Sequence, residues 1–150
     1  MARAMRSAYL ETTAEDLWSF LEAPQSITEW WPNCVQIYDV RRSEDGRLAF
    51  KWVDRCGELA LRGEVEEVVE QEGKRLAVHI TGDIHGDMAW RLEPQNGGVK
   101  LDFESDYDLP VRSLIPFLSP MRLLTYQQDE ADAIVARMKE HYSHQQSVSR

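Results

Sequence analysis

The segment from Val99 to Leu109 alternates strictly between two kinds of side chain. The odd-numbered positions hold Val99, Leu101, Phe103, Ser105, Tyr107 and Leu109. The even-numbered positions hold Lys100, Asp102, Glu104, Asp106 and Asp108. A period of two predicts a strand in a sheet with one covered face and one solvated face. Another part of the chain must therefore cover this sheet.

A long amphipathic helix near the C-terminus is predicted to be that cover. Ser119 suits the N-cap and Pro120 the first helical position, and the helix is expected to end near Tyr142. Its apolar stripe, at three- and four-residue spacing, is predicted to consist of Met121, Leu124, Gln128, Ala131, Val135, Met138 and Tyr142. Residues 143–150 are expected to form a polar, disordered tail.

The remaining chain predicts one strand, two short helices and then a series of hairpins. A strand over 4–11 precedes a helix capped by Thr12 or Thr13, and a second short helix runs from Pro24 to Trp31. Turn signals such as Asp-Gly and Asn-Gly then separate six strands near 34–43, 47–55, 58–71, 74–81, 84–93 and 99–109. Glu66 and Glu67 interrupt the alternation of their strand and predict a bulge there.

Length and charge limit the functions that the chain can have. The 150 residues predict one domain, and 26 acidic against 17 basic residues give a net charge of −9. This charge repels phosphate backbones, so we expect no nucleic-acid partner. No apolar run approaches the ~20 residues that span a bilayer, which predicts a cytoplasmic protein without stable membrane insertion. Cys34 and Cys56 lack metal-ligand spacing and are expected to be reduced thiols.

Three segments, taken with the order of predicted elements, resemble a known superfamily. They are T-T-A-E-D-L-W-S-F-L at 12–21, W-W-P-N at 30–33 and L-D-F-E-S-D-Y-D-L-P at 101–110. Over residues 3–142 the chain resembles the START-like superfamily of polyketide cyclases, coenzyme Q-binding proteins and pollen allergens. The resemblance implies an α+β helix-grip fold, in which a curved seven-stranded antiparallel sheet wraps around the C-terminal helix. Two short helices lie between the first two strands, and residues 1–142 form the ligand-binding domain.

In such a fold, a hydrophobic or aromatic small molecule is expected to lie between the sheet and the long helix. Its predicted contacts are Trp31, Phe50, Trp52, Trp90, Phe103, Ser105, Tyr107, Leu124 and Gln128. The aromatic rings suit an apolar ligand, while Ser105, Tyr107 and Gln128 supply polar groups that orient it. Two alternatives remain open: the aromatic residues fill a dry core, and the Gln128 amide pairs with Tyr107 or a buried water.

The sequence assigns no catalytic residue and gives no argument for a metal or cofactor. His79, His85 and Asp87 could together ligate zinc, but their neighbours are expected to take the covered side, so all three are predicted to face solvent. Asp54 is the only carboxylate predicted near the covered face. Arg62 is predicted to point outward, so the chain offers no equivalent of the inward arginine that the resemblance implies for aromatases.

Three functions fit these expectations. The leading hypothesis is a polyketide cyclase/dehydrase-like protein that folds its substrate mainly by proximity. Trp52, Trp90 and Phe103 would shape the substrate, and Tyr107 and Gln128 would bind its oxygens. The alternative is a non-catalytic carrier or sensor for a lipid or quinone, which the scarcity of inward titratable groups favours. The third is a protein-binding regulator, although the outward residues suggest no apolar patch. A monomer or weak homodimer is expected.

Overall fold

The computed structural model describes residues 2–56, 59–108 and 120–149 of the chain. Its elements are β1 (Ala2–Leu10), α1 (Ala14–Glu22), η1 (Pro24–Ser26), α2 (Ile27–Trp30), β2 (Cys34–Arg42), β3 (Leu48–Cys56), β4 (Leu59–Gln71), β5 (Arg75–Gly82), β6 (His85–Gln95), β7 (Gly98–Asp108) and α4 (Pro120–Ser149). The strands form one antiparallel sheet in the order β1-β7-β6-β5-β4-β3-β2. The predicted α+β helix-grip architecture is therefore confirmed.

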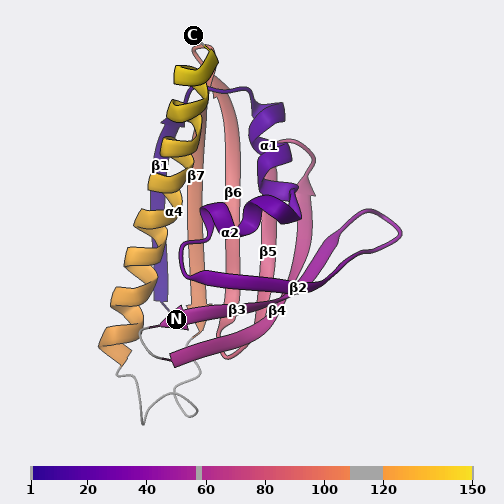
Figure 1. Ribbon diagram of the computed structural model, residues 1–150, viewed down its shortest axis with the longest axis vertical. Helices are drawn as coiled ribbons and strands as arrows, with labels where there is room; N and C mark the ends of the chain where they lie inside the picture. The colour runs from indigo at the N-terminus through magenta and orange to yellow at the C-terminus, as the bar shows by residue number, and fades with distance from the viewer. Residues whose placement is uncertain (1, 57–58, 109–119, 150) are drawn as a thin grey trace.

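The sheet bends around the helices, which all lie on one of its faces. In Figure 1, β2, β3 and the first part of β4 run across the direction of the other four strands, and β4 then bends to pair with β5. The long helix α4 lies along β1 and β7, and α1 and α2 lie in front of β5 and β6. The interior of the domain is the space between this curved sheet and the three helices.

The strand β7 pairs with both β1 and β6 and has the predicted alternation. Its covered residues are Val99, Leu101, Phe103, Ser105 and Tyr107, each at most 1% exposed. The predicted cap of α1 is also present, because the Thr13 hydroxyl accepts a hydrogen bond from the Asp16 amide at 3.1 Å. These local predictions held because neighbouring residues alone determine them.

A glycine determines how closely the Trp52 ring packs on the sheet. Gly63 is the register partner of Trp52 on the neighbouring strand. A Cβ atom at Gly63 would lie 2.6 Å from the indole ring and 2.0 Å from the Thr81 carbonyl oxygen. Because no side chain fits there, only glycine allows the indole to lie flat against β4.

Two predictions about element geometry are wrong. Pairing between β4 and β5 is regular at Glu66 and Glu67, and the bulge lies instead between Val69 and Gln71. Glu67 therefore continues the covered side of β4 and is 2% exposed. The helix α4 also extends past Tyr142 to Ser149, because no glycine or proline ends it there. Leu109 and the predicted cap Ser119 lie outside the described residues.

The packing of Trp90 gives a test of the fold. Trp90 is 1% exposed and lies edge-to-face against Trp30, with ring centroids 5.1 Å apart. Trp90→Ala should lower the free energy of unfolding by about 3–5 kcal/mol, because it leaves a cavity in the core. Urea denaturation measures this loss. Val40 is 45% exposed, so Val40→Ala is the control and should change stability by only about 0.5 kcal/mol. Equal losses in the two variants would contradict the packed core.

Candidate functional site

Two carboxylates lie in the interior where β3, β7 and α4 meet. Asp54 is 0% exposed and lies on the covered side of β3, where the alternation also places Phe50 and Trp52. Glu130 is 1% exposed and lies on the face of α4 that also buries Ile134. Buried carboxylates are rare unless other groups hydrogen-bond to them. Their immediate partners therefore determine what the site can do.

Each carboxylate accepts a hydrogen bond from a tyrosine. The Tyr107 hydroxyl donates to Glu130 Oε1 at 2.5 Å, and the Trp31 indole N–H donates to Glu130 Oε2 at 3.1 Å. The Tyr126 hydroxyl donates to Asp54 Oδ2. We call these five residues the Asp54–Glu130 cluster. It joins β3, β7 and α4 to Trp31, the residue that follows α2, so separate parts of the chain fix its geometry.

Burial makes both acids weaker than they are in water. It raises the pKa of Asp54 to about 6, against the opposing hydrogen bonds from Tyr126 and the Arg55 amide. It raises the pKa of Glu130 to about 7, where the hydrogen bond from Tyr107 opposes the rise and the charge of Asp54 adds to it. Near neutral pH the cluster can therefore hold one carboxylic acid and one carboxylate, the combination that general acid–base chemistry needs.

The two tyrosines remain hydrogen-bond donors throughout the physiological pH range. Burial, with the nearby charge of Glu130, raises the pKa of both Tyr107 and Tyr126 well above the usual value for a phenol. Neither hydroxyl therefore ionises near neutral pH. Both are available to position an acid or the oxygen of a substrate.

Most of the predicted ligand contacts face the interior. Trp31, Phe50, Trp52, Trp90, Phe103, Ser105 and Tyr107 are each at most 4% exposed. Their predicted orientation is confirmed, and their role in binding a ligand stays a prediction. Two of them have partners that the sequence did not indicate: Trp31 and Tyr107 both hydrogen-bond to Glu130.

The predicted inner face of α4 is wrong in its first turns. Leu124 is 38% exposed. The Gln128 amide accepts a hydrogen bond from Arg6 Nη2 at 2.7 Å and donates to the Arg3 carbonyl at 3.4 Å, so it faces β1. The buried amide is Gln127, which donates to Ser105 Oγ at 3.0 Å. From Ala131 onward the predicted stripe is confirmed, because Ala131, Val135, Met138 and Tyr142 are buried.

The sequence analysis missed two inward carboxylates, Glu67 and Glu130, and the inward-facing Tyr126. A signal was present for each acid. Glu67 follows Gly63 and Val65 at alternate positions of β4, and Glu130 lies four residues before the fully buried Ile134. Carboxylates are usually solvated, so the sequence alone does not place either acid in the interior. The prediction that Asp54 is the only inward carboxylate is therefore wrong.

The interior space beneath α2 is small. The cavity there measures about 20 Å3, and its lining includes Trp30, Trp31, Phe50 and Trp90. Such a volume holds about one water molecule, whereas pockets for organic ligands measure roughly 300–1,000 Å3. A ligand of that size beneath α2 would therefore require the packed aromatic side chains to rearrange.

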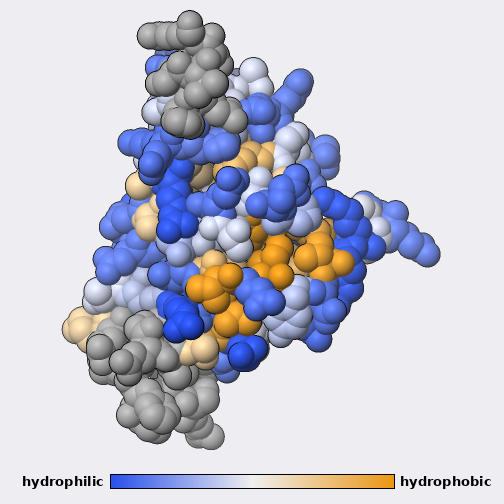
Figure 2. Space-filling view, viewed as in Figure 1, coloured by the Kyte–Doolittle hydropathy of each residue, from blue (hydrophilic) through white to orange (hydrophobic). Residues whose placement is uncertain are grey.

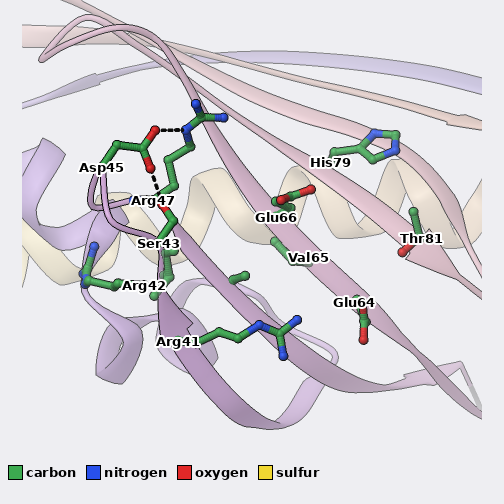
Figure 3. Close-up of a pocket in the computed structure, with 12 residues that line it drawn as sticks. Arg41, Arg42, Ser43, Asp45, Arg47, Glu64, Val65, Glu66, His79 and Thr81 are labelled. Atoms are coloured by element: carbon green, nitrogen blue, oxygen red, sulfur yellow. Dashed lines mark hydrogen bonds and ion pairs between the residues drawn. The ribbon is translucent and has the colours of Figure 1, made fainter.

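A larger hollow lies on the outer side of the sheet. This groove of about 500 Å3 is formed by the β2–β3 hairpin and outward side chains of β4 and β5 (Figure 3). Charges of both signs line it, including Arg41, Glu64 and Glu66, and Asp45 accepts a hydrogen bond from Arg47 at 2.8 Å. Its polar lining does not match the hydrophobic ligand that the sequence predicts.

Apolar surface follows β2, one of the two edge strands of the sheet (Figure 2). On this strand Val35, Tyr38 and Val40 are 53%, 37% and 45% exposed. The prediction that the outward residues form no apolar patch is therefore wrong along this edge. The sequence did not indicate it because bulges in β2 disturb the alternation of its side chains.

The histidines of β5 and β6 face solvent, as predicted. His79 Nδ1 lies 2.9 Å from Asp87 Oδ1, and both side chains are exposed. Within the described ranges, no three His, Cys, Asp or Glu residues are grouped to hold a metal. Cys34 is a free thiol, and burial raises its pKa to about 12; the Cys56 side chain lies outside the described part. No described helix is long and apolar enough to span a bilayer.

The raised pKa values predict how stability varies with pH. Native Asp54 and Glu130 keep their protons up to pH about 6 and 7, whereas the unfolded chain releases them near pH 4. The two groups therefore lower the free energy of unfolding as the pH rises from about 4 to about 7, by on the order of 3 kcal/mol each. Glu130→Gln, which cannot ionise, should lose less stability between pH 5 and pH 8 than the wild type in urea denaturation. If the stability of Glu130→Gln and of the wild type varied identically with pH, the raised pKa of Glu130 would be contradicted.

Comparisons with known proteins agree with this architecture. A START superfamily protein from Mycobacterium smegmatis superposes with a TM-score of 0.70 at 13% identity, over 96% of this chain and 99% of that one. The Zhui aromatase/cyclase from Streptomyces sp. R1128 superposes with a TM-score of 0.72 at 9% identity, over 94% of this chain and 93% of that one. The Aha1 dimer from Colwellia psychrerythraea superposes with a TM-score of 0.64 at 10% identity, over 95% of this chain and 96% of that one. At these identities the likeness shows the fold alone.

Sequence comparisons identify the family. No curated protein matches the chain. The model of the family described as "Polyketide cyclase / dehydrase and lipid transport" matches residues 1–142, nearly the whole chain. The protein therefore belongs to the polyketide cyclase/dehydrase and lipid transport family.

Proposed function

We propose that the protein is a polyketide cyclase/dehydratase-like enzyme whose acid–base groups are Asp54 and Glu130. The observation that carries the proposal is the buried pair itself, with pKa values of about 6 and 7. A general acid and base work best with pKa values near the operating pH, and such shifts are concentrated at functional sites. No cofactor is needed for this chemistry.

The proposed reaction is the dehydration of a β-hydroxy ketone formed as the substrate chain cyclises. The Asp54 carboxylate removes the proton from the carbon between the carbonyl and the carbon bearing the hydroxyl. The electron pair forms the carbon–carbon double bond while the hydroxyl leaves with a proton from the Glu130 carboxylic acid, so the products are an enone and water. The proton that Asp54 has taken then passes to Glu130 through the Tyr126 hydroxyl, which restores the carboxylate of Asp54 and the carboxylic acid of Glu130.

The inward titratable groups favour this enzyme over a passive carrier. A carrier for an apolar compound gains nothing from burying carboxylates, because burial of a charge is costly. Tyr126 hydrogen-bonds to Asp54, and the charges of Asp54 and Glu130 both raise its pKa. Its hydroxyl therefore lies within reach of both acids and can pass a proton between them. Aromatic side chains such as Trp52 and Phe103 would hold the substrate's carbon chain.

The test uses a linear poly-β-ketone thioester of tetraketide length as substrate. The wild type should produce a dehydrated, cyclised product faster than buffer alone, as measured by liquid chromatography. Asp54→Asn and Glu130→Gln should each slow this step by about 100-fold or more, the usual contribution of a general acid or base. The wild-type rate should be bell-shaped in pH, with its limbs near pH 6 and 7.

Gln128→Leu is the matched control. Gln128 lies two residues from Glu130 on α4 but faces β1, so its replacement should leave the rate unchanged. A wild type that is no faster than buffer, or acid variants as fast as the wild type, would contradict the proposed function.

The second candidate is a non-catalytic carrier of a lipid or another apolar compound. The aromatic lining beneath α2 favours it, and the family description includes lipid transport. Native mass spectrometry of the protein purified from its own host separates the two, because a carrier should retain an apolar compound without converting it. The cytoplasmic location and the monomeric or weakly dimeric state stay predictions, although one neighbour of similar fold was solved as a dimer.

A further inference from the structure

The cavity beneath α2 shares Trp31 with the Asp54–Glu130 cluster, but neither carboxylate of the cluster lines it. Leu48 and Phe50 of β3 line it, whereas Asp54 lies further along the same strand and does not. Glu67 also lines it, at the end nearest Leu48, whose backbone amide hydrogen-bonds to the Glu67 carboxyl. A polar group in this cavity therefore serves a different site from the acid pair.

Three polar atoms of residues that line this cavity have no hydrogen-bond partner among the described residues. They are Trp30 Nε1, Trp90 Nε1 and Glu67 Oε1. The three residues are 4%, 1% and 2% exposed, so bulk water does not reach them. Because folded proteins satisfy nearly all buried polar atoms, three unsatisfied atoms around one cavity indicate a ligand or ordered solvent.

The chemistry of these atoms selects the group that fits between them. Each indole only donates a hydrogen bond, and a carboxyl oxygen accepts one. The oxygen of one O–H group can accept from both indoles and donate its hydrogen to Glu67. A cation cannot accept from the indoles, and an anion would be repelled by the acidic pair of Glu67 and Glu22. The volume of about 20 Å3 matches a single group of water size.

We propose that Trp30, Trp90 and Glu67 form a subsite for one neutral O–H group, supplied by a water molecule or by the hydroxyl of a bound ligand. The charged groups that face Glu67 are Glu22 of α1 and Arg42 of β2. Burial, and then the neighbouring Glu22, raises the pKa of Glu67 to about 7. The carboxyl accepts a hydrogen bond in either protonation state, so the subsite works on both sides of neutral pH.

Water–protein NOE and ROE spectra of protein labelled with 15N at tryptophan test the subsite directly. A long-lived water should give cross-peaks to the indole N–H protons of both Trp30 and Trp90. Glu67→Gln keeps an acceptor and should retain both cross-peaks, whereas Glu67→Leu should lose both. Trp18 and Trp52 are internal controls: their indole nitrogens are also buried without a partner in the described part, but they do not line this cavity. They should give no cross-peak.

Three results of the wild-type spectrum would overturn the subsite. They are no water cross-peak, a cross-peak to one of the two indoles only, and equal cross-peaks to all four. The edge-to-face pair of Trp30 and Trp90 offers the competing explanation, in which one N–H points at the other ring. That arrangement would shift a single indole proton upfield and give no water cross-peak. The wild-type spectrum alone decides whether the subsite exists, so the test remains valid even if a Glu67 variant fails to fold.

A second arm, which rests on the proposed function, identifies the source of the O–H group. It compares 2-naphthol with naphthalene, which share a ring system and differ in one hydroxyl. If the ligand supplies the group, 2-naphthol should remove the water cross-peaks and bind about tenfold more tightly than naphthalene, with the difference lost in Glu67→Leu. If water supplies it, the cross-peaks should persist with 2-naphthol present. Both results support the subsite, and the first arm stands even if catalysis is absent.

Discussion

Burial of one face of the sheet against α4 is the constraint on which the rest of the structure depends. The alternation of β7 places its apolar side chains on one face of the sheet, where they must be shielded from water. The long helix α4 covers that face. The contact places Ile134 and Met138 at 0% exposure against the sheet. Once the helix is held in this rotation, Gln127 and Glu130 must also enter the interior. The acid pair is thus a consequence of the same packing that stabilises the fold.

The interior is polar at two places and aromatic between them. The inner side of β3 runs from Leu48, beside Glu67, to Asp54, six positions further along. At about 3.3 Å per residue this separates the two acidic regions by roughly 20 Å. Phe50 and Trp52 lie between them. The proposed polyketide-type substrate, with an apolar body and oxygen atoms near both ends, would match this order.

The sequence predicted what neighbouring residues determine and failed where distant residues decide. The alternation of β7 and the Thr13 cap are local, and both were predicted. The inward side of the first turns of α4 is not local, because stripes that begin at Gln127 and at Gln128 both have three- and four-residue spacing. Glu130 is buried because its hydrogen-bond partners Trp31 and Tyr107, which lie 99 and 23 residues away in sequence, converge on it. No sequence pattern predicts that Trp31 and Tyr107 come together at Glu130.

The most direct measurement is a 13C NMR titration of the carboxyl groups, with the Asp54 and Glu130 signals assigned from Asp54→Asn and Glu130→Gln. The account predicts two coupled transitions with apparent pKa values of about 6 and 7. Two independent transitions near pH 4, the range of solvated carboxylates, would contradict it, because the acid pair would then lie in water and could not work as an acid and a base at neutral pH.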